Sequence, residues 1–508
     1  MGSPSPSMDE NRTTDDGSLS LSSKQLYRPE VDVSTIDERK LLRRVDLHVI
    51  PWLTVLYLLN FLDRGSIGNA RLYGFQEDIG INDNQYLIAL TVFFFPYSLF
   101  EPVSNVVLRR LRPSIWLSSM MFMWGVVMTL HGTIRNYGGL ITLRVLLGLF
   151  EAGMYPGIVF YISSWYTRSE MGLRVAIFFS SATVAGAFSG LLAAAIANMD
   201  GIGGKPGWAW IFILEGLATI VLAIVSFWVI QDFPDTAKFL TDEERVFIVR
   251  RLQDDMKFSA GGETFKAHYV WKSLSDWKTW IAMGIYMGFD GPLYAFSLFL
   301  PSIINQLGFQ ATEANLLSVP VYAWGCFLTC IIGFLGDRIG GRYRINLCLL
   351  GIGLVAYIIL IISRSPALSY FSVFLAVSAI YPTIPNSVAW VANNVEGSYK
   401  RSVTLGMAIG FGNLNGAVTA NIYRASDKPW YRLGHSIVLA YIAIGFICSV
   451  IFAWYLRQEN ARRDRGERDE IIVGINNPQA HERNGRYEST DAAKIDKGDD
   501  WSGFRYTL

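Results

Sequence analysis

The chain contains 508 residues, of which 51% are hydrophobic and 17% are charged, and its formal net charge is +1. A soluble domain carries about 25% charged residues, so the composition indicates a membrane protein. The near-zero net charge, with Lys and Arg confined to short segments between apolar stretches, argues against nucleic acid as the main partner.

Twelve apolar stretches are long enough to cross the hydrocarbon core of a bilayer, which takes about 20 residues. They lie near 48–67, 85–106, 115–134, 140–163, 173–197, 208–230, 279–301, 315–336, 345–363, 367–391, 403–424 and 436–457. We therefore expect an all-α membrane protein with twelve transmembrane helices. A polar connector, residues 231–278, divides six stretches from six, which indicates two halves related by duplication, 46–230 and 279–457. Within the connector, LTDEERVFIVRRL predicts an amphipathic helix capped by Thr241.

Polar tails flank the apolar stretches. Residues 1–45 are rich in Ser, Asp and Thr, which predicts disorder, and no folded domain is expected in the tail 458–508. Lys and Arg are concentrated in alternate loops, such as 109–112 and 338–344, with 424–432 as the dissenting cluster. By the positive-inside rule, this pattern predicts a multi-pass protein of the cell membrane with both termini in the cytosol.

A glycine-rich charged loop, GFLGDRIGGRYR, follows the eighth apolar stretch. Its glycines permit a tight turn and close helix approach. It resembles the Gly-x-x-x-Asp-Arg-x-Gly-Arg loop of the major facilitator superfamily, which implies that superfamily's fold. The resemblance implies a gating loop formed by Gly333, Asp337, Arg338, Gly340 and Arg342. We expect Asp337 to pair with basic groups of the neighbouring helix, whereas the equivalent place in the first half carries Leu108.

Two charged pairs lie inside apolar stretches: Asp63 with Arg64, and Arg144 with Glu151. A charge at the centre of a bilayer costs about 2.5–3.5 kcal/mol on insertion scales, so such residues face the bundle interior and find partners. Arg144 and Glu151 are seven residues apart and share a helix face. With cytosolic termini, the helix rise places both pairs at similar depths. Two interpretations remain open: a static, electrically balanced network, or a site for protons and an anion, which we favour.

The sequence around these pairs resembles the anion:cation symporter family, whose fungal branch includes permeases for allantoate and nicotinate. The resemblance rests on YLLNFLDRGSIGN, LRVLLGLFEAGMYPG and FPDTAKFLTDEE, and covers roughly residues 38–460. It implies that Asp63 and Glu151 carry protons. It also implies that Arg64 contacts the substrate carboxylate and that Arg144 tunes the acids.

Polar and aromatic side chains within the spans are further candidates for substrate contact. These are Asn60, Tyr286, Tyr294, Asn386, Trp390 and Asn413. Aromatic faces and amide dipoles suit a flat aromatic or heteroaromatic acid, although most aromatic residues of the chain are expected to serve packing. Asp290 is either a third titrating group or a carboxylate near the end of its span, in water.

From the resemblance we expect a proton-coupled transporter that imports a small organic anion, nicotinate or a similar monocarboxylate, by alternating access. The alternatives are an exporter or facilitator of a pathway metabolite and, in another class, a transporter-like nutrient receptor. The sequence has no nucleophile–base set and no cluster of metal ligands, so we expect no enzyme activity, no cofactor and no metal. The expected partners are the anion, protons and the lipid bilayer, and we expect a monomer.

Overall fold

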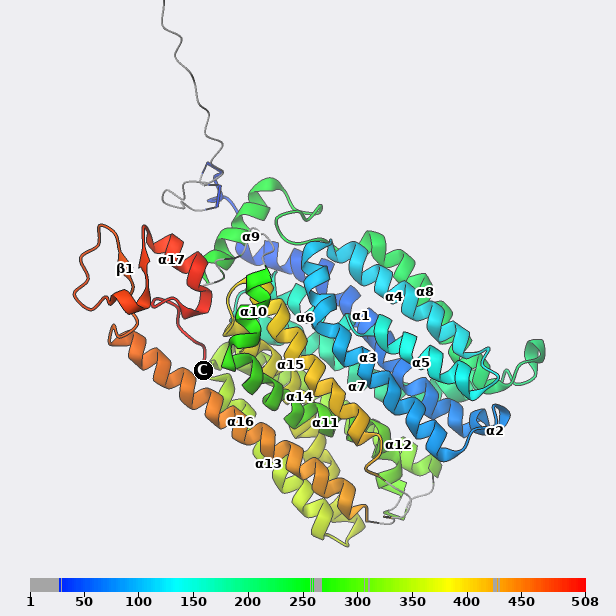
Figure 1. The fold of residues 1–508 in the computed structure, drawn as a ribbon. Coiled ribbons are helices and arrows are strands. Elements are labelled where there is room, and N and C mark those ends of the chain that lie inside the picture. The colour runs from blue at the N-terminus through cyan, green and yellow to red at the C-terminus, as the bar shows by residue number, and fades with distance from the viewer. Residues whose placement is uncertain are drawn as a thin grey trace, which may run out of the picture.

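The structure, a computed structural model, describes residues 27–28, 30–255, 257, 259, 267–305, 307–308, 311–423, 427 and 430–508. It is a bundle of long helices with short connections (Figure 1). The helices of the first half are α1 (Glu38–Leu72), α2 (Phe75–Asp78), α3 (Asp83–Arg110), α4 (Pro113–His131), α5 (Tyr137–Glu151), α6 (Met154–Ser163), α7 (Met171–Ala197), η1 (Ile202–Gly204) and α8 (Gly207–Val229). Those of the second half are α11 (Trp277–Asn305), α12 (Ala311–Ile339), α13 (Arg342–Ile362), α14 (Pro366–Asn393), α15 (Ser398–Thr419) and α16 (Arg432–Asp464).

The prediction of an all-helical membrane fold is confirmed. Every predicted stretch coincides with a helix, and ten spans among the described residues are long and apolar enough to cross a membrane. The helices that cover the remaining two stretches are α11 and α15. In α15, Asn413, Asn415 and several glycines dilute the apolar character.

The fourth predicted span, 140–163, is two helices, because the chain breaks between Glu151 and Met154. Pro156 explains the break, since it has no N–H to donate to Ala152 and its ring crowds that carbonyl. Gly153 lies at this break. It also permits close packing against α3, because a Cβ at this position would lie 2.0 Å from Ser104 Oγ.

The prediction of disorder for residues 1–45 is wrong for residues 38–45, which are helical. Residues 1–26 and 29 lie outside the described residues. Residues 38–45 form the first turns of α1, because the Asp37 carboxylate accepts the N–H groups of Arg39 and Lys40 at 3.1 and 3.2 Å and caps the helix.

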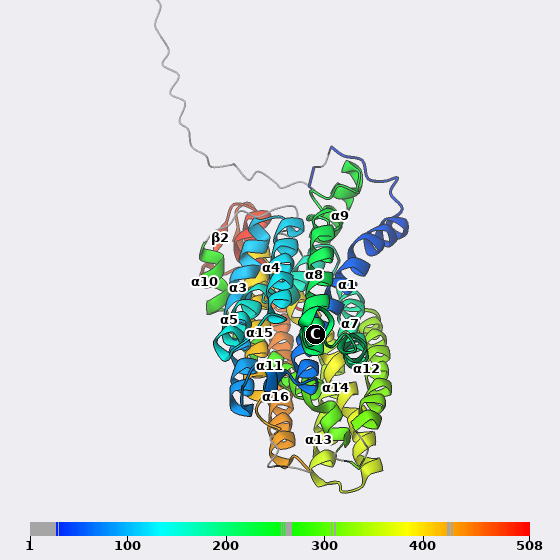
Figure 2. The same ribbon diagram turned by 90° about the vertical axis from the view of Figure 1, so that its right-hand side faces the viewer.

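The connector contains α9 (Asp242–Asp254) and α10 (Ala267–Ser275). The predicted cap is confirmed, since Thr241 and Glu244 form a reciprocal capping box. Helices α9 and α10 lie at the end of the bundle where α1 begins and α16 ends (Figure 2), which we call the tail end. Lys257 joins the connector to the first half by donating to Ser163 O at 2.8 Å and Tyr166 O at 2.6 Å. Burial lowers the pKa of Lys257 to about 7.

The C-terminal tail, 458–508, contains short elements of secondary structure. After α16, the strands β1 (Ile471–Ile472) and β2 (Arg486–Tyr487) pair in parallel, followed by α17 (Thr490–Lys497) and η4 (Gly498–Asp500). The chain then returns to the bundle, where Asp499 is completely buried between Lys278 and Lys400. The polar composition alone gave no sign of this contact, which depends on residues more than 90 positions apart.

The two halves meet along two helix pairs, α3 with α15 and α7 with α12. At the second pair, a Cβ on Gly333 would lie 2.4 Å from Ala176 Cβ, so only glycine permits this approach of α12 to α7. Asp337 accepts the N–H groups of Gly172 and Leu173, at 2.9 and 2.6 Å, at the start of α7. Its basic partner is Arg342 on α13.

At the matching joint, between α3 and α15, Leu108 stands at the position equivalent to Asp337. Leu108 is fully buried there, and Asn105 on α3 instead donates to Ser402 O on α15 at 3.0 Å. In the glycine loop, Gly340 and Gly341 have φ values of +68° and +59°, which glycine adopts readily. Arg338 is exposed, with its guanidinium 5.9 Å from the Phe334 ring centroid.

Replacing Asp337 with Asn should loosen the joint between α7 and α12, because the amide loses the charge that holds Arg342 and keeps one acceptor oxygen. Spin labels at the exposed positions Ser169 and Ile339, on a background without native cysteines, would report the separation. We expect a broader distance distribution with a longer mean. Asp242→Asn, which breaks an exposed pair with Arg245 on α9, is the control. An unchanged distribution in Asp337→Asn would contradict a holding role for this contact.

Candidate functional site

A polar network surrounds the guanidinium of Arg64, which lies in the second half of α1. Arg64 Nη2 lies 2.5 Å from Glu151 Oε1, the carboxylate at the last residue of α5. Asn60, one turn before Arg64, donates to the same oxygen at 2.9 Å. Arg64 also donates to the hydroxyls of Tyr97 and Tyr294, at 3.0 and 2.9 Å. Three predicted site residues, Asn60, Glu151 and Tyr294, therefore lie around a fourth, Arg64.

The network crosses from one half of the chain to the other. The Tyr294 hydroxyl on α11 donates to Asn413 Oδ1 on α15 at 2.6 Å. Asn413 Nδ2 donates in turn to Glu101 Oε1 on α3 at 2.5 Å. Glu101 is completely buried, and its other oxygen has no hydrogen-bond partner among the described residues. The bonds thus link α1, α11, α15 and α3 at the joint between the halves.

Aromatic rings enclose the guanidinium. The ring centroids of Phe61, Tyr97 and Tyr294 lie 5.1, 5.2 and 5.5 Å from Arg64 Cζ, within cation–π distance. The Arg64 side chain keeps 15% exposure, whereas that of Glu151 keeps 1%. A planar guanidinium in an aromatic enclosure can bind a carboxylate through two parallel hydrogen bonds while the rings contact a flat apolar body.

Asp63 and Arg144, the other charged members predicted from the sequence, lie outside this network. Asp63 is buried and accepts the Thr219 hydroxyl of α8 at 3.0 Å. Arg144 is buried on α5, and its Nε and Nη2 have no hydrogen-bond partner among the described residues. Among the described residues, neither Asp63 nor Arg144 forms a hydrogen bond with Arg64 or Glu151.

Acidic side chains outnumber arginines in the middle of the described spans. Besides Asp63 and Glu151, the described spans bury Glu101, Glu215 and Asp290, against the arginines Arg64 and Arg144 in the middle of the first half. Each of the three is a single carboxylate inside an apolar stretch. The rule that selected Asp63 therefore applies equally to Glu101 and Glu215.

Two predicted substrate contacts lie at the tail end instead of beside Arg64, which corrects their assignment. Asn386 is buried against Arg342, to whose carbonyl it donates at 3.0 Å. Trp390 Nε1 donates to Thr507 O of the C-terminal tail at 3.0 Å. Asn386 lies about two turns and Trp390 about three turns beyond the centre of α14, and a candidate list based on residue type alone did not consider this position along the helix.

Tyr286 and Asp290 lie on α11 beside α15 and are buried. A Cβ on Gly412 would lie 2.3 Å from Asp290 Oδ2 and 3.1 Å from Tyr286 Cβ, so glycine makes room for both. Burial excludes the interpretation of Asp290 as a carboxylate at a water-exposed end of its span. Its Oδ2 has no partner among the described residues.

Comparison with known proteins gives consistent results for family and fold. Residues 53–420 match the model of the Major Facilitator Superfamily. The chain is 35% identical over 466 residues to the MFS-type transporter cnsO of Penicillium expansum, covering 89% of each chain. It is 32% identical to the high-affinity nicotinic acid transporter of Saccharomyces cerevisiae, covering 84% of this chain and 79% of that one.

Among solved structures, the proton:xylose symporter XylE shares the fold with a TM-score of 0.58 and 15% sequence identity, over 80% of this chain and 95% of that chain. Both the family model and the relatives span most of the chain, and the helix arrangement agrees with them. The protein is therefore a multi-pass membrane transporter that belongs to the major facilitator superfamily.

Proposed function

We propose that this transporter imports a small organic anion together with protons and that its tail end faces the cytosol. The observation that carries the proposal is the Arg64–Glu151 ion pair, which lies inside an aromatic enclosure at the joint between the two halves. A symporter for an anion needs a cationic group that binds the substrate and an acid whose protonation state changes when the substrate binds. Arg64 and Glu151 supply both groups within one contact.

Competition for Arg64 would couple the anion to the proton. An incoming carboxylate that accepts two parallel hydrogen bonds from the Arg64 guanidinium displaces Glu151 from it. The released carboxylate then lies buried without its cation, with Asn60 as its remaining donor, and burial favours its neutral form. Glu151 therefore takes up a proton when the anion binds and gives it up when the anion leaves.

Alternating access would follow from relative motion of the two halves around this network. Arg64 is bonded to both halves at once, through Glu151 and Tyr97 in the first and Tyr294 in the second. Opening the bundle on either side would separate these groups. Asp337 and the amides of α7 would hold the tail end closed while the site exchanges on the opposite side.

A flat monocarboxylate of the nicotinate type is the substrate class that fits these groups best. The rings of Phe61, Tyr97 and Tyr294 offer apolar faces around one guanidinium, which suits a single carboxylate on an aromatic body. The resemblance to the nicotinic acid transporter of Saccharomyces cerevisiae supports this choice.

The proposal is tested by uptake of a panel of labelled vitamins and organic acids into cells that lack endogenous permeases. We expect accumulation of an aromatic monocarboxylate that rises as the external pH falls. An export or facilitator function would instead give efflux from loaded cells, or equilibration without accumulation.

Glu151→Gln should separate proton coupling from binding, because the amide imitates the neutral acid and cannot titrate. We expect accumulation driven by a pH gradient to be lost, while exchange of internal for external substrate at equal pH persists. The control is Glu243→Gln, an exposed acid in the first turn of α9. Equal loss of accumulation and exchange in Glu151→Gln would point to a purely structural pair.

The two arginines should respond differently to replacement by Lys, which keeps the charge and loses the planar fork. Arg64→Lys should weaken anion binding by about 1.5–3 kcal/mol, the range for a hydrogen bond to a charged group. Arg144→Lys should leave binding closer to normal and shift the pH of half-maximal uptake. Binding would be measured in detergent at fixed pH, and uptake across a pH series. The reverse pattern would exchange the roles assigned to Arg64 and Arg144.

A further inference from the structure

Two carboxyl groups outside the Arg64 network, Asp63 and Glu215, are linked reciprocally across α1 and α8. Thr219, one turn after Glu215 on α8, donates to Asp63 at 3.0 Å. Ser66, one turn after Asp63 on α1, is hydrogen-bonded to Glu215 Oε2. All four residues are at most 5% exposed. Each helix therefore contributes one acid and the hydroxyl that contacts the other acid.

The two hydroxyl hydrogens can reach at most one oxygen of each carboxylate. Ser66 Oγ lies within hydrogen-bond distance of both Glu215 Oε2 and Leu62 O, the latter at 3.1 Å, but a serine hydroxyl carries one hydrogen. If that hydrogen goes to Leu62 O, the contact with Glu215 needs a proton from the acid itself. The second oxygens, Asp63 Oδ1 and Glu215 Oε1, have no partner among the described residues.

No basic group compensates this pair in the described part of the chain. The other charged or titratable side chains on helices α2, α4, α5, α6 and α7 around it are Glu77, Asp78, His131, Tyr137, Arg144, Glu151, Tyr155, Tyr161 and Arg174. None of them is bonded to Asp63 or Glu215, and Arg64, next to Asp63, is bonded to Glu151. Two negative charges buried on neighbouring helices without a cation would be strongly unfavourable.

We propose that Asp63 and Glu215 form one proton-binding unit and that Glu215 is a proton-carrying residue of the transport cycle. The inference rests on the proposed function, because it assigns the transported proton to a second site beside the Arg64–Glu151 pair. One carboxylate of the unit takes a proton from the side from which the anion enters and returns it to solvent on the other side. Protonation neutralises a charge that the anion does not touch.

The test compares uptake at pH 5 and pH 7 with exchange at equal pH. In Glu215→Gln we expect the ratio of uptake at the two pH values to fall towards 1 while exchange persists. Thr219→Val removes the hydroxyl that donates to Asp63 and stabilises its ionised form, so half-maximal uptake should move to higher pH. Glu77→Gln, an exposed acid on α2, is the control and should behave as the wild type.

The outcomes separate this inference from the proposed function. Anion uptake by the wild type that does not depend on pH would overturn the proposed function. A wild type that depends on pH, with an unchanged ratio in Glu215→Gln, would overturn this inference alone. If Glu215→Gln also loses exchange, Thr219→Val decides: a shift to higher pH supports the unit, and an unchanged profile overturns it.

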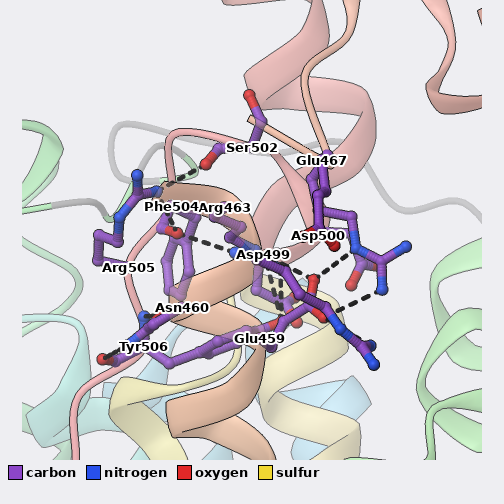
Figure 3. A network of polar contacts seen from close by, with 12 residues as sticks. Glu459, Asn460, Arg463, Glu467, Asp499, Asp500, Ser502, Phe504, Arg505 and Tyr506 are labelled. Carbon is purple, nitrogen blue, oxygen red and sulfur yellow. Dashed lines mark hydrogen bonds and ion pairs between the residues drawn. The ribbon is translucent and has the colours of Figure 1, made fainter. Parts of the chain in front are cut away.

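A second observation concerns the last residues of the chain, 498–508, which we call the strap (Figure 3). The strap is bound to the second half at several points. Lys400 lies 2.9 Å from Asp499, and Arg463 donates to Phe504 O at 2.8 Å. Thr507 O accepts the side chains of Trp390 and Asn394 at 3.0 and 2.9 Å.

The strap also contacts the first half, through Arg168 in the loop between α6 and α7. Arg168 donates to Arg505 O at 3.0 Å, and its guanidinium lies 5.3 Å from the centroid of the Phe504 ring. The Arg168 carbonyl accepts Asn393 at 2.8 Å and Arg342 at 3.4 Å. The strap therefore binds the residue of the first half that also contacts the joint between α7 and α12.

Asp499 holds the strap with a permanent charge. Burial alone would raise the pKa of Asp499, but Lys278 and Lys400 outweigh burial and hold this pKa below its ordinary value. The carboxylate thus stays ionised over the whole range of cellular pH.

From this double attachment we infer that the strap is an autoinhibitory clasp that favours the conformation closed at the tail end. Opening the tail end separates Arg168 from α14 and so requires the strap to leave at least one of the halves. Detachment of the strap lowers the free-energy difference between the closed and open conformations.

Asp499→Ala and a chain lacking residues 504–508 test the clasp by two routes, with spin labels at Ser169 and Ile339. We expect both to increase the population with a longer distance between the labels and to speed substrate exchange. Asp500→Ala is the matched control, since Asp500 is 52% exposed and 3.7 Å from Lys278. Wild-type distances and exchange rates in the shortened chain would overturn the inference, whatever the behaviour of Asp499→Ala.

Discussion

The structure depends on one constraint: an ionised group inside an apolar bundle must find partners from other helices, because lipid offers none. Arg64 satisfies this constraint by hydrogen bonds to Glu151 on α5, Tyr97 on α3 and Tyr294 on α11. These bonds bring helices of both halves to one point. The hydrogen bonds that stabilise the buried guanidinium are therefore also bonds between the two halves. A ligand that binds Arg64 necessarily changes the contact between the halves.

The two joints between the halves are alike in position and different in chemistry. At the joint of α7 and α12, a charged aspartate accepts backbone amides at a helix N-terminus, where the helix dipole favours negative charge. At the joint of α3 and α15, Asn105 makes a neutral bond with a carbonyl, and Asn413 donates to the buried carboxylate of Glu101. Both joints therefore include a carboxylate, but Asp337 accepts backbone amides whereas Glu101 accepts a side-chain amide.

The sequence predicted the helices and the cap at Thr241, because each leaves a local signal: an apolar run or a capping motif. It named Asn60, Arg64, Glu151 and Tyr294 as separate candidates, and the structure brings these four side chains together. The sequence placed Asn386 and Trp390 wrongly, since residue type does not reveal depth in a bundle. Glu101 and Glu215 carried the same local signal as Asp63 and were overlooked. The docking of Asp499 onto Lys278 and Lys400 could not be predicted, because it joins distant segments without a shared pattern.

The break between α5 and α6 has a consequence for Glu151. This residue ends α5, and Pro156 removes the backbone bond that would tie the Ala152 carbonyl to the next turn. Glu151 therefore sits at a hinge rather than in the middle of a continuous rod. A small change of backbone torsion at Ala152 and Gly153 can swing the carboxylate towards or away from Arg64 while α6 stays packed. The acid can thus move by a local bend, with no need for the whole span to shift.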